Sequence, residues 1–67
     1  MNSYLLTQTR KKRGFSQEQM AKMLDYKSKS SYCLIEKCKV NMSLNCAKKI
    51  KDILRLTDKE FNNIFLQ

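Results

Sequence analysis

The chain has 67 residues, and a domain of this size buries only about 60% of the surface of its unfolded chain, which excludes a large active-site cavity. Its 14 Lys and Arg residues outnumber 6 Asp and Glu residues, and the net charge of +8 favours a polyanionic partner. Pro is absent, and no segment alternates apolar and polar residues as a strand would, so we expect a compact all-α domain of five helices.

The first helix is predicted from about residue 2 to residue 12, with Leu5, Leu6 and Thr9 facing inward. Gly14 is expected to follow it in the left-handed conformation that disfavours a side chain. Polar and charged residues follow Leu6 at once, so we expect neither a signal peptide nor a membrane span, and we place the protein in the cytoplasm.

The second helix is predicted at about residues 17–24, because Ser16 and Gln19 have the spacing of a capping box. Ala21 is small enough to let another helix cross closely. The third helix is expected at about residues 29–37, capped by Ser28 or Ser30. On it, Tyr32 is expected in the core with its hydroxyl group at the edge, followed by Ile35 and Glu36.

The last two helices have their own start signals. Ser43 is expected to cap the fourth helix, and Thr57 with Glu60 forms a second capping box that opens the fifth. Helical spacing relates four apolar residues of the fourth helix, Leu44, Ala47, Ile50 and Leu54. The chain has no repeat or linker, so residues 1–67 are predicted to form one domain.

The sequence predicts neither a metal site nor an enzyme. Cys33, Cys38 and Cys46 form no Cys-x-x-Cys pair, and there is no His to complete a zinc site or to activate a nucleophile. We expect free thiols, no catalytic residues, no cofactor and no small-molecule substrate.

A series of residues in order resembles the phage-repressor and Cro type (xenobiotic-response-element type) of helix-turn-helix domain over about residues 2–65. The series is Leu6, Arg10, Gly14-Phe15-Ser16-Gln17, Ala21, Leu24, Tyr32, Ile35-Glu36, Lys39, Ser43-Leu44, Ala47, Ile50, Leu54, Leu56 and Phe61. The resemblance implies a sequence-specific double-stranded DNA-binding transcriptional regulator, a small repressor of phage or mobile-element type, in the cytoplasm of a bacterial or phage-infected cell.

The resemblance also implies roles for individual residues. The third helix would be the recognition helix, and Arg10 and Glu36 would form a structural ion pair between the first and third helices. The candidates for DNA base contacts are Lys27, Ser28, Lys29, Ser30 and Leu34, and those for DNA phosphate contacts are Gln17, Ser31, Lys37, Lys39, Asn41 and Arg13. For Gln17 and the basic residues the alternative is a solvated side chain, and for the serines it is an ordinary helix cap. Leu34 could either rest on a thymine methyl group or be exposed without function.

The chain departs from the family pattern at several positions. Asp25, Cys38 and Arg55 stand where relatives often have Gly, and a left-handed backbone there would cost about 1 kcal/mol or more for each bulky residue. Met42 replaces a usual Pro. One extra residue between Leu24 and Glu36 lengthens the turn and shifts which side chains face DNA.

The C-terminal segment is more apolar than the last helix of a monomer needs. It either folds back onto the core or forms a homodimer interface, at least on DNA, with Phe61, Ile64, Phe65 and Leu66 as candidates. The alternative function is a protein-interaction module that binds a regulator, toxin or polymerase subunit through this segment.

Overall fold

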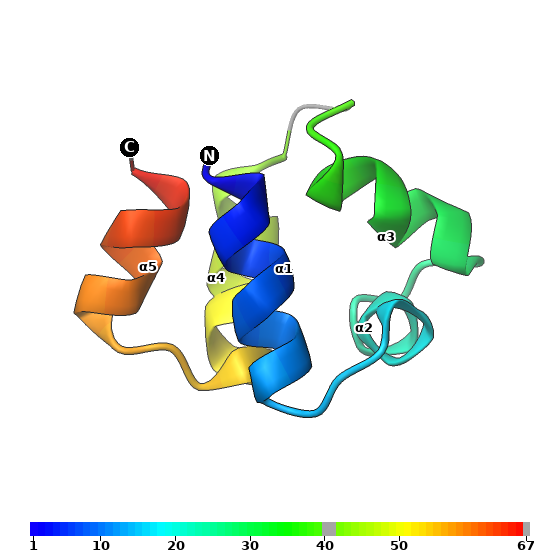
Figure 1. Ribbon diagram of the computed structural model, residues 1–67. Helices are drawn as coiled ribbons and strands as arrows, with labels where there is room; N and C mark the ends of the chain where they lie inside the picture. Colours follow the sequence, from blue (N-terminus) through cyan, green and yellow to red (C-terminus); the bar gives the residue numbers. More distant parts are fainter. Residues whose placement is uncertain (40–41, 67) are drawn as a thin grey trace.

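The computed structural model describes residues 1–39 and 42–66. These residues form five helices joined by turns and loops, and none of them forms a strand (Figure 1). In chain order they are α1 (Ser3–Lys12), α2 (Gln17–Met23), α3 (Lys29–Glu36), α4 (Leu44–Leu54) and α5 (Asp58–Phe65). The predicted all-α class is therefore confirmed for these residues. Among them, no helix is both long enough and apolar enough to cross a membrane.

The helices begin where the sequence places its capping residues. At the start of α2, Ser16 Oγ accepts a hydrogen bond from Gln19 N at 3.0 Å, and Gln19 Oε1 accepts one from Ser16 N at 2.8 Å. The pair Thr57 and Glu60 repeats this exchange at the start of α5, at 3.1 and 2.9 Å. Ser43 Oγ caps α4 as predicted. Each bond satisfies an amide group that the first turn of a helix leaves without a partner.

The cap of α3 differs from the prediction. Ser28 is the residue that precedes the helix, but its side chain makes no capping hydrogen bond. The first turn of α3 is therefore less firmly fixed by its own sequence than the first turns of α2, α4 and α5, and its position depends more on packing.

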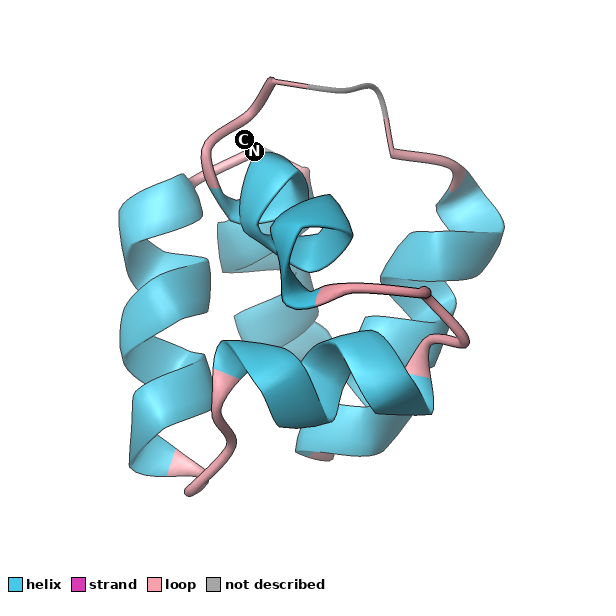
Figure 2. Ribbon diagram, turned by 90° about the vertical axis from the view of Figure 1, so that its right-hand side faces the viewer, coloured by secondary structure: helices cyan, strands magenta, loops and turns pink. Residues whose placement is uncertain are grey.

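Helices α2 and α3 cross steeply and pack against each other more extensively than other helix pairs. Figure 1 shows α2 nearly end-on, whereas Figure 2, turned by 90°, shows it from the side below an end-on α3. Ala21 lies at this crossing and is buried, together with Met20 and Leu24 of the same segment. A side chain of this small size allows the two helix axes to approach closely.

The core lies where all five helices meet. Its largest fully buried side chains are Leu6, Met20, Tyr32, Ile50, Leu54 and Ile64. The two ends of the chain lie side by side in Figures 1 and 2, and Asn2 N donates a hydrogen bond to Ile64 O at 2.7 Å. This contact and the packing of α5 on α1 close the core on the side away from α2 and α3.

Two sequence expectations are wrong, those for Ile64 and Tyr32, and the exposure of Leu44 was not foreseen. Ile64, a candidate for the dimer interface, is completely buried inside the monomer and cannot contact a second copy. Leu44 is 62% exposed, because it lies on the first turn of α4 beside an open groove instead of facing the core. The hydroxyl group of Tyr32 is buried, not at the edge, and has no hydrogen-bond partner among the described residues.

Four residues adopt the left-handed conformation after a helix, although only Gly14 was expected to do so. Gly14 has φ +85°, and the three residues that stand in place of family glycines, Asp25, Cys38 and Arg55, have φ of 61°, 57° and 54°. After Arg55, Leu56 N donates a hydrogen bond to Lys51 O at 3.0 Å, the bond between residues five positions apart that defines a Schellman motif. The geometry of these helix ends is thus kept although three of the four residues carry a side chain that strains it.

We expect Arg55→Gly to stabilise the fold by about 0.5–1 kcal/mol, because removing the strained Cβ contributes more than the added backbone entropy of Gly costs. In a domain of this size the gain corresponds to a melting temperature about 2–8 °C higher, measured by circular dichroism. Arg55→Ala is the control, since it removes the guanidinium but keeps the Cβ. An equal gain in both variants would show that the side chain, not the backbone strain, is responsible.

Candidate nucleic-acid interface

Helix α3 has a buried face and a basic, polar face. Tyr32, Ile35 and Glu36 are buried, whereas the residues on the other side of the helix and at its ends are exposed or half-buried. The exposed set includes Lys27, Ser28, Lys29, Ser30, Leu34, Lys37 and Lys39, while Ser31 and Cys33 are half-buried. The structure thus brings most of the predicted DNA-contacting residues together on one helix and its two ends.

A buried ion pair holds the inner face of α3 against α1. Arg10 Nε donates a hydrogen bond to Glu36 Oε2 at 2.7 Å, and the two side chains are only 7% and 4% exposed. Thr7 Oγ1 donates to the other carboxylate oxygen at 2.8 Å, and Arg10 Nη1 donates to Phe15 O at 2.6 Å. The predicted pair is therefore present, and it also ties α3 to the segment that leads into α2.

The surroundings of Glu36 favour its charged form. Burial by itself raises the pKa of this carboxyl group, but hydrogen bonds from Thr7 and Arg10 and the positive charge of Arg10 lower it to below its ordinary value. Burial and the nearby carboxylate raise the pKa of Tyr32 far above its usual range. At neutral pH, Glu36 is ionised and Tyr32 is neutral, so this part of the core carries one compensated pair of charges.

The turn before α3 is anchored to α4. Tyr26 Oη and Cys46 Sγ share a hydrogen bond of 3.3 Å. This bond and partial burial raise the pKa of Tyr26 to about 12. The contact fixes the turn between α2 and α3, which carries Lys27 and Ser28.

Gln17 lies on the first turn of α2, beside the ion pair. Its Nε2 atom is 3.5 Å from Glu36 Oε1, a long hydrogen bond, and the side chain is half-buried. Gln17 and Lys29 line the same shallow hollow together with Arg10, Ser16 and Glu18. The predicted phosphate contact of α2 and the first residue of α3 are thus neighbours in space.

Arg13, also predicted to contact phosphate, forms hydrogen bonds and an ion pair with other residues of the chain. Its Nε donates to Leu54 O at 3.0 Å, and its Nη2 lies 3.0 Å from both carboxylate oxygens of Glu60. These bonds connect the end of α1 to the end of α4 and to α5. The remaining predicted phosphate contact, Asn41, lies outside the described residues.

Lys39 is oriented by the end of α3. Its backbone N donates to Leu34 O at 2.9 Å, and Cys38 N donates to Ile35 O at 3.1 Å, the two bonds of a Schellman motif. The left-handed Cys38 therefore turns the chain so that Lys39 follows directly after the last turn of the helix.

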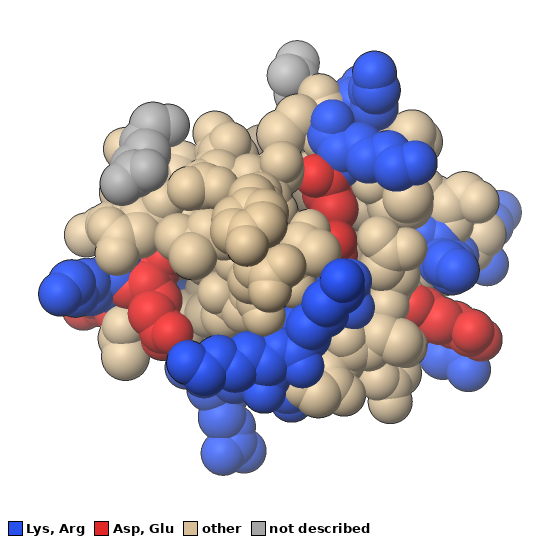
Figure 3. Space-filling view, viewed as in Figure 1, with Lys and Arg blue, Asp and Glu red and all other residues tan. Residues whose placement is uncertain are grey.

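The basic residues differ in how far acidic residues neutralise them. In the described part of the chain, the four ion pairs use Arg10, Arg13, Lys22 and Lys51. None of these pairs involves the lysines on and around α3, Lys27, Lys29, Lys37 and Lys39. Figure 3 shows Lys and Arg side chains across the lower middle of this face as well as on the side of α2 and α3.

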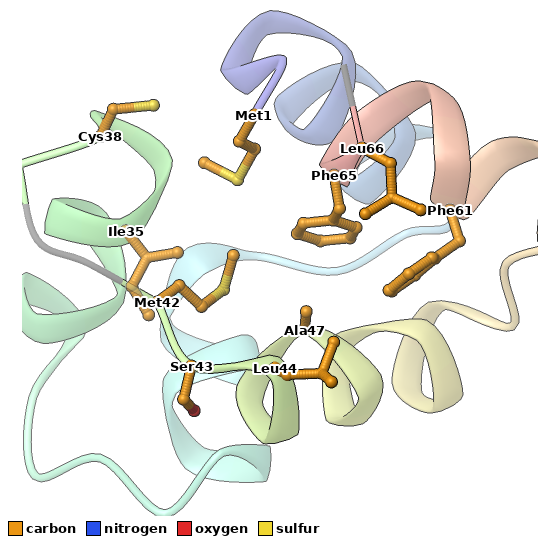
Figure 4. A pocket seen from close by; sticks show the side chains of 10 residues that line it. All are labelled: Met1, Ile35, Cys38, Met42, Ser43, Leu44, Ala47, Phe61, Phe65 and Leu66. Carbon is orange, nitrogen blue, oxygen red and sulfur yellow. The ribbon is translucent and has the colours of Figure 1, made fainter.

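An apolar groove of about 410 Å³ lies between α5, the first turn of α4, the N-terminus and the C-terminal end of α3. Figure 4 shows Phe61 and Phe65 of α5 pointing toward Leu44 and Ala47 of α4. The two phenyl rings are 4.9 Å apart, and Leu66 at the edge of the groove is 66% exposed. Three of the four dimer candidates, Phe61, Phe65 and Leu66, thus lie on this surface.

The sequence analysis missed two contributors to this arrangement, Thr7 and the brace formed by Arg13. Thr7 precedes Arg10 by three residues and so shares its helix face, a spacing that could have indicated a common partner. No local signal connects Arg13 with Leu54 or Glu60, which lie more than forty residues further along the chain.

No known protein family, curated protein or solved structure matches the chain. Within residues 1–39 and 42–66, no three side chains of the metal-binding types lie close enough to hold an ion. The three cysteines are free thiols.

Proposed function

We propose that the protein is a sequence-specific double-stranded DNA-binding transcriptional regulator of the helix-turn-helix type, a small repressor of the phage-repressor and Cro kind. The observation that carries the proposal is the outer face of α3. It presents lysine and serine side chains that form no ion pair within residues 1–39 and 42–66, while the inner face is fixed against α1 by a buried ion pair.

The dimensions and chemistry of α3 suit the major groove of DNA. An α-helix fits this groove, and Lys29 and Ser30 on its first turn have donors for base edges such as guanine O6 and N7. Lys37 and Lys39 at the other end of α3 are in position for the phosphate backbone, as is Gln17 at the start of α2. Lys27 and Ser28 precede the helix and Ser31 lies at its side, so they reach the groove only at its edge.

The proposed regulator binds DNA as a homodimer. One molecule measures about 30 Å in its longest dimension and has one recognition helix, whereas successive major-groove half-sites are about 34 Å apart. A second copy of the chain fits the apolar groove of Phe61, Phe65 and Leu66, whose lining side chains are uncharged. Although Ile35 and Cys38 at the end of α3 also line this groove, the outward side chains Lys29, Ser30 and Leu34 do not, so pairing there would leave them free to contact DNA.

Fluorescence anisotropy with a duplex selected from a random pool, compared with its scrambled sequence, tests the proposal. We expect Lys29→Ala to reduce the discrimination between the two duplexes by about 1–3 kcal/mol. Lys39→Ala should weaken both equally and reduce the slope of log affinity against log salt concentration by about 0.9.

Lys59→Ala is the matched control, because it removes the same charge from α5, far from α3. It should change affinity less than Lys39→Ala does. Equal affinity of the wild type for selected and scrambled duplexes at all salt concentrations would contradict sequence-specific binding.

The apolar groove also favours a second candidate function, a protein-interaction module that binds a regulator, toxin or polymerase subunit. A stoichiometric complex with such a protein, combined with no duplex binding at low salt, would reverse the order of the two proposals.

A further inference from the structure

The outer face of α3 contains a shallow hollow of about 280 Å³, lined by both apolar and polar side chains. Its lining residues are Lys29, Ser30, Cys33, Leu34 and Lys37. Leu34 is 42% exposed, and it is the exposed large apolar residue of this helix. An apolar side chain in the middle of a basic and polar face leaves surface that a partner can remove from water.

The two ends of the hollow are positively charged. Lys29 and Lys37 are eight residues apart, which corresponds to about 12 Å along a helix axis. This separation is close to the width of the major groove, about 12 Å. The ammonium groups can therefore reach phosphates or guanine acceptors on both sides, while Cys33 and Leu34 between them face the base edges.

Among the groups on the base edges in the major groove, the 5-methyl group of thymine is the apolar one. It matches the apolar side chains of Cys33 and Leu34 in the hollow, and the hydroxyl group of Ser30, which lines the same hollow, can donate a hydrogen bond to thymine O4. An uncharged protein surface docked here would bury the two lysines without compensation, whereas a DNA groove supplies the negative charge that they need.

We propose that this hollow receives the methyl group of a thymine in each half-site, so that Leu34 and Cys33 determine a thymine preference that hydrogen bonding alone would not give. The inference rests on the proposed DNA-binding function and adds one specificity-determining contact to it.

The test replaces each thymine of the selected duplex by deoxyuridine, one position at a time, which removes a methyl group and leaves the base-pairing groups unchanged. We expect wild-type protein to bind about four-fold more weakly when the thymine over the hollow is replaced, the effect of about one buried methyl group. Leu34→Ala should bind the thymine and deoxyuridine duplexes equally. Because Leu34 is exposed, this variant is expected to fold.

Met23→Ala is the control, since Met23 is an exposed apolar residue on α2 outside the hollow, and it should retain the four-fold difference. Two outcomes separate the claims. If wild-type protein prefers the selected duplex over the scrambled one but tolerates deoxyuridine at all positions, the methyl contact is refuted and the DNA-binding function stands. If it has no preference for any duplex, both are refuted.

Discussion

Glu36→Ala is expected to destabilise the fold by about 3–5 kcal/mol, enough to unfold a large fraction of a small domain near its working temperature. The substitution leaves the Arg10 guanidinium, almost completely buried, without the carboxylate that compensates its charge. Thr7 loses its hydrogen-bond acceptor at the same time. Urea unfolding followed by circular dichroism measures the loss.

The double variant Arg10→Met, Glu36→Leu is the informative control. It fills the site with apolar side chains and leaves no buried charge, so it should recover most of the stability that either single substitution loses. If it is as unstable as the sum of the two singles, the pair contributes net stability and our account of it is wrong.

Acid titration of the unfolding free energy is a second readout for this ion pair. The pKa of Glu36 is lowered in the folded protein, so its contribution is complete above the unfolded value of 4.5 and is lost as the pH falls through the folded pKa. The double variant lacks the carboxyl group and should lose less stability over that range.

Ile64→Ala is expected to cost about 2–5 kcal/mol of folding stability, whereas Leu66→Lys should change it by less than about 0.5 kcal/mol. Ile64 is completely buried between α5 and the rest of the core, and its removal leaves a cavity there. Leu66 is mostly exposed at the edge of the apolar groove. The two residues are close in sequence, but only Leu66 can contact a second copy of the chain.

Leu66→Lys should instead abolish dimer formation, measured by sedimentation of the protein with a palindromic duplex. The control is Tyr4→Lys, which adds the same charge at an exposed position of α1 that does not line the groove. Dimers that persist in Leu66→Lys would place the interface elsewhere. A loss in Ile64→Ala no larger than that of a surface substitution would contradict its place in the core.

The family resemblance led to the correct partners Arg10 and Glu36, although they are 26 residues apart. It also identified Asp25, Cys38 and Arg55 as positions where relatives often have Gly, and the structure shows that all three keep the left-handed backbone. The resemblance also made Leu34 a candidate for a base contact, but only the structure shows that its side chain shares one hollow with Lys29, Ser30, Cys33 and Lys37.

The sequence by itself determined the helix class, most of the helix starts and the excess of positive charge. These features depend on residues within about four positions of one another, such as Ser16 with Gln19 and Thr57 with Glu60, or on composition alone. Local spacing therefore suffices to predict them.

The tertiary structure alone decided which of several similar residues are buried. Leu44 and Ile64 are both apolar and both fit a helical stripe, yet one is exposed beside a groove and the other is in the core. Likewise, Arg13 braces α4 and α5, whereas Lys37 and Lys39 form no ion pair within the described residues. Burial and pairing depend on segments that are distant in sequence, and no local pattern specifies how those segments meet.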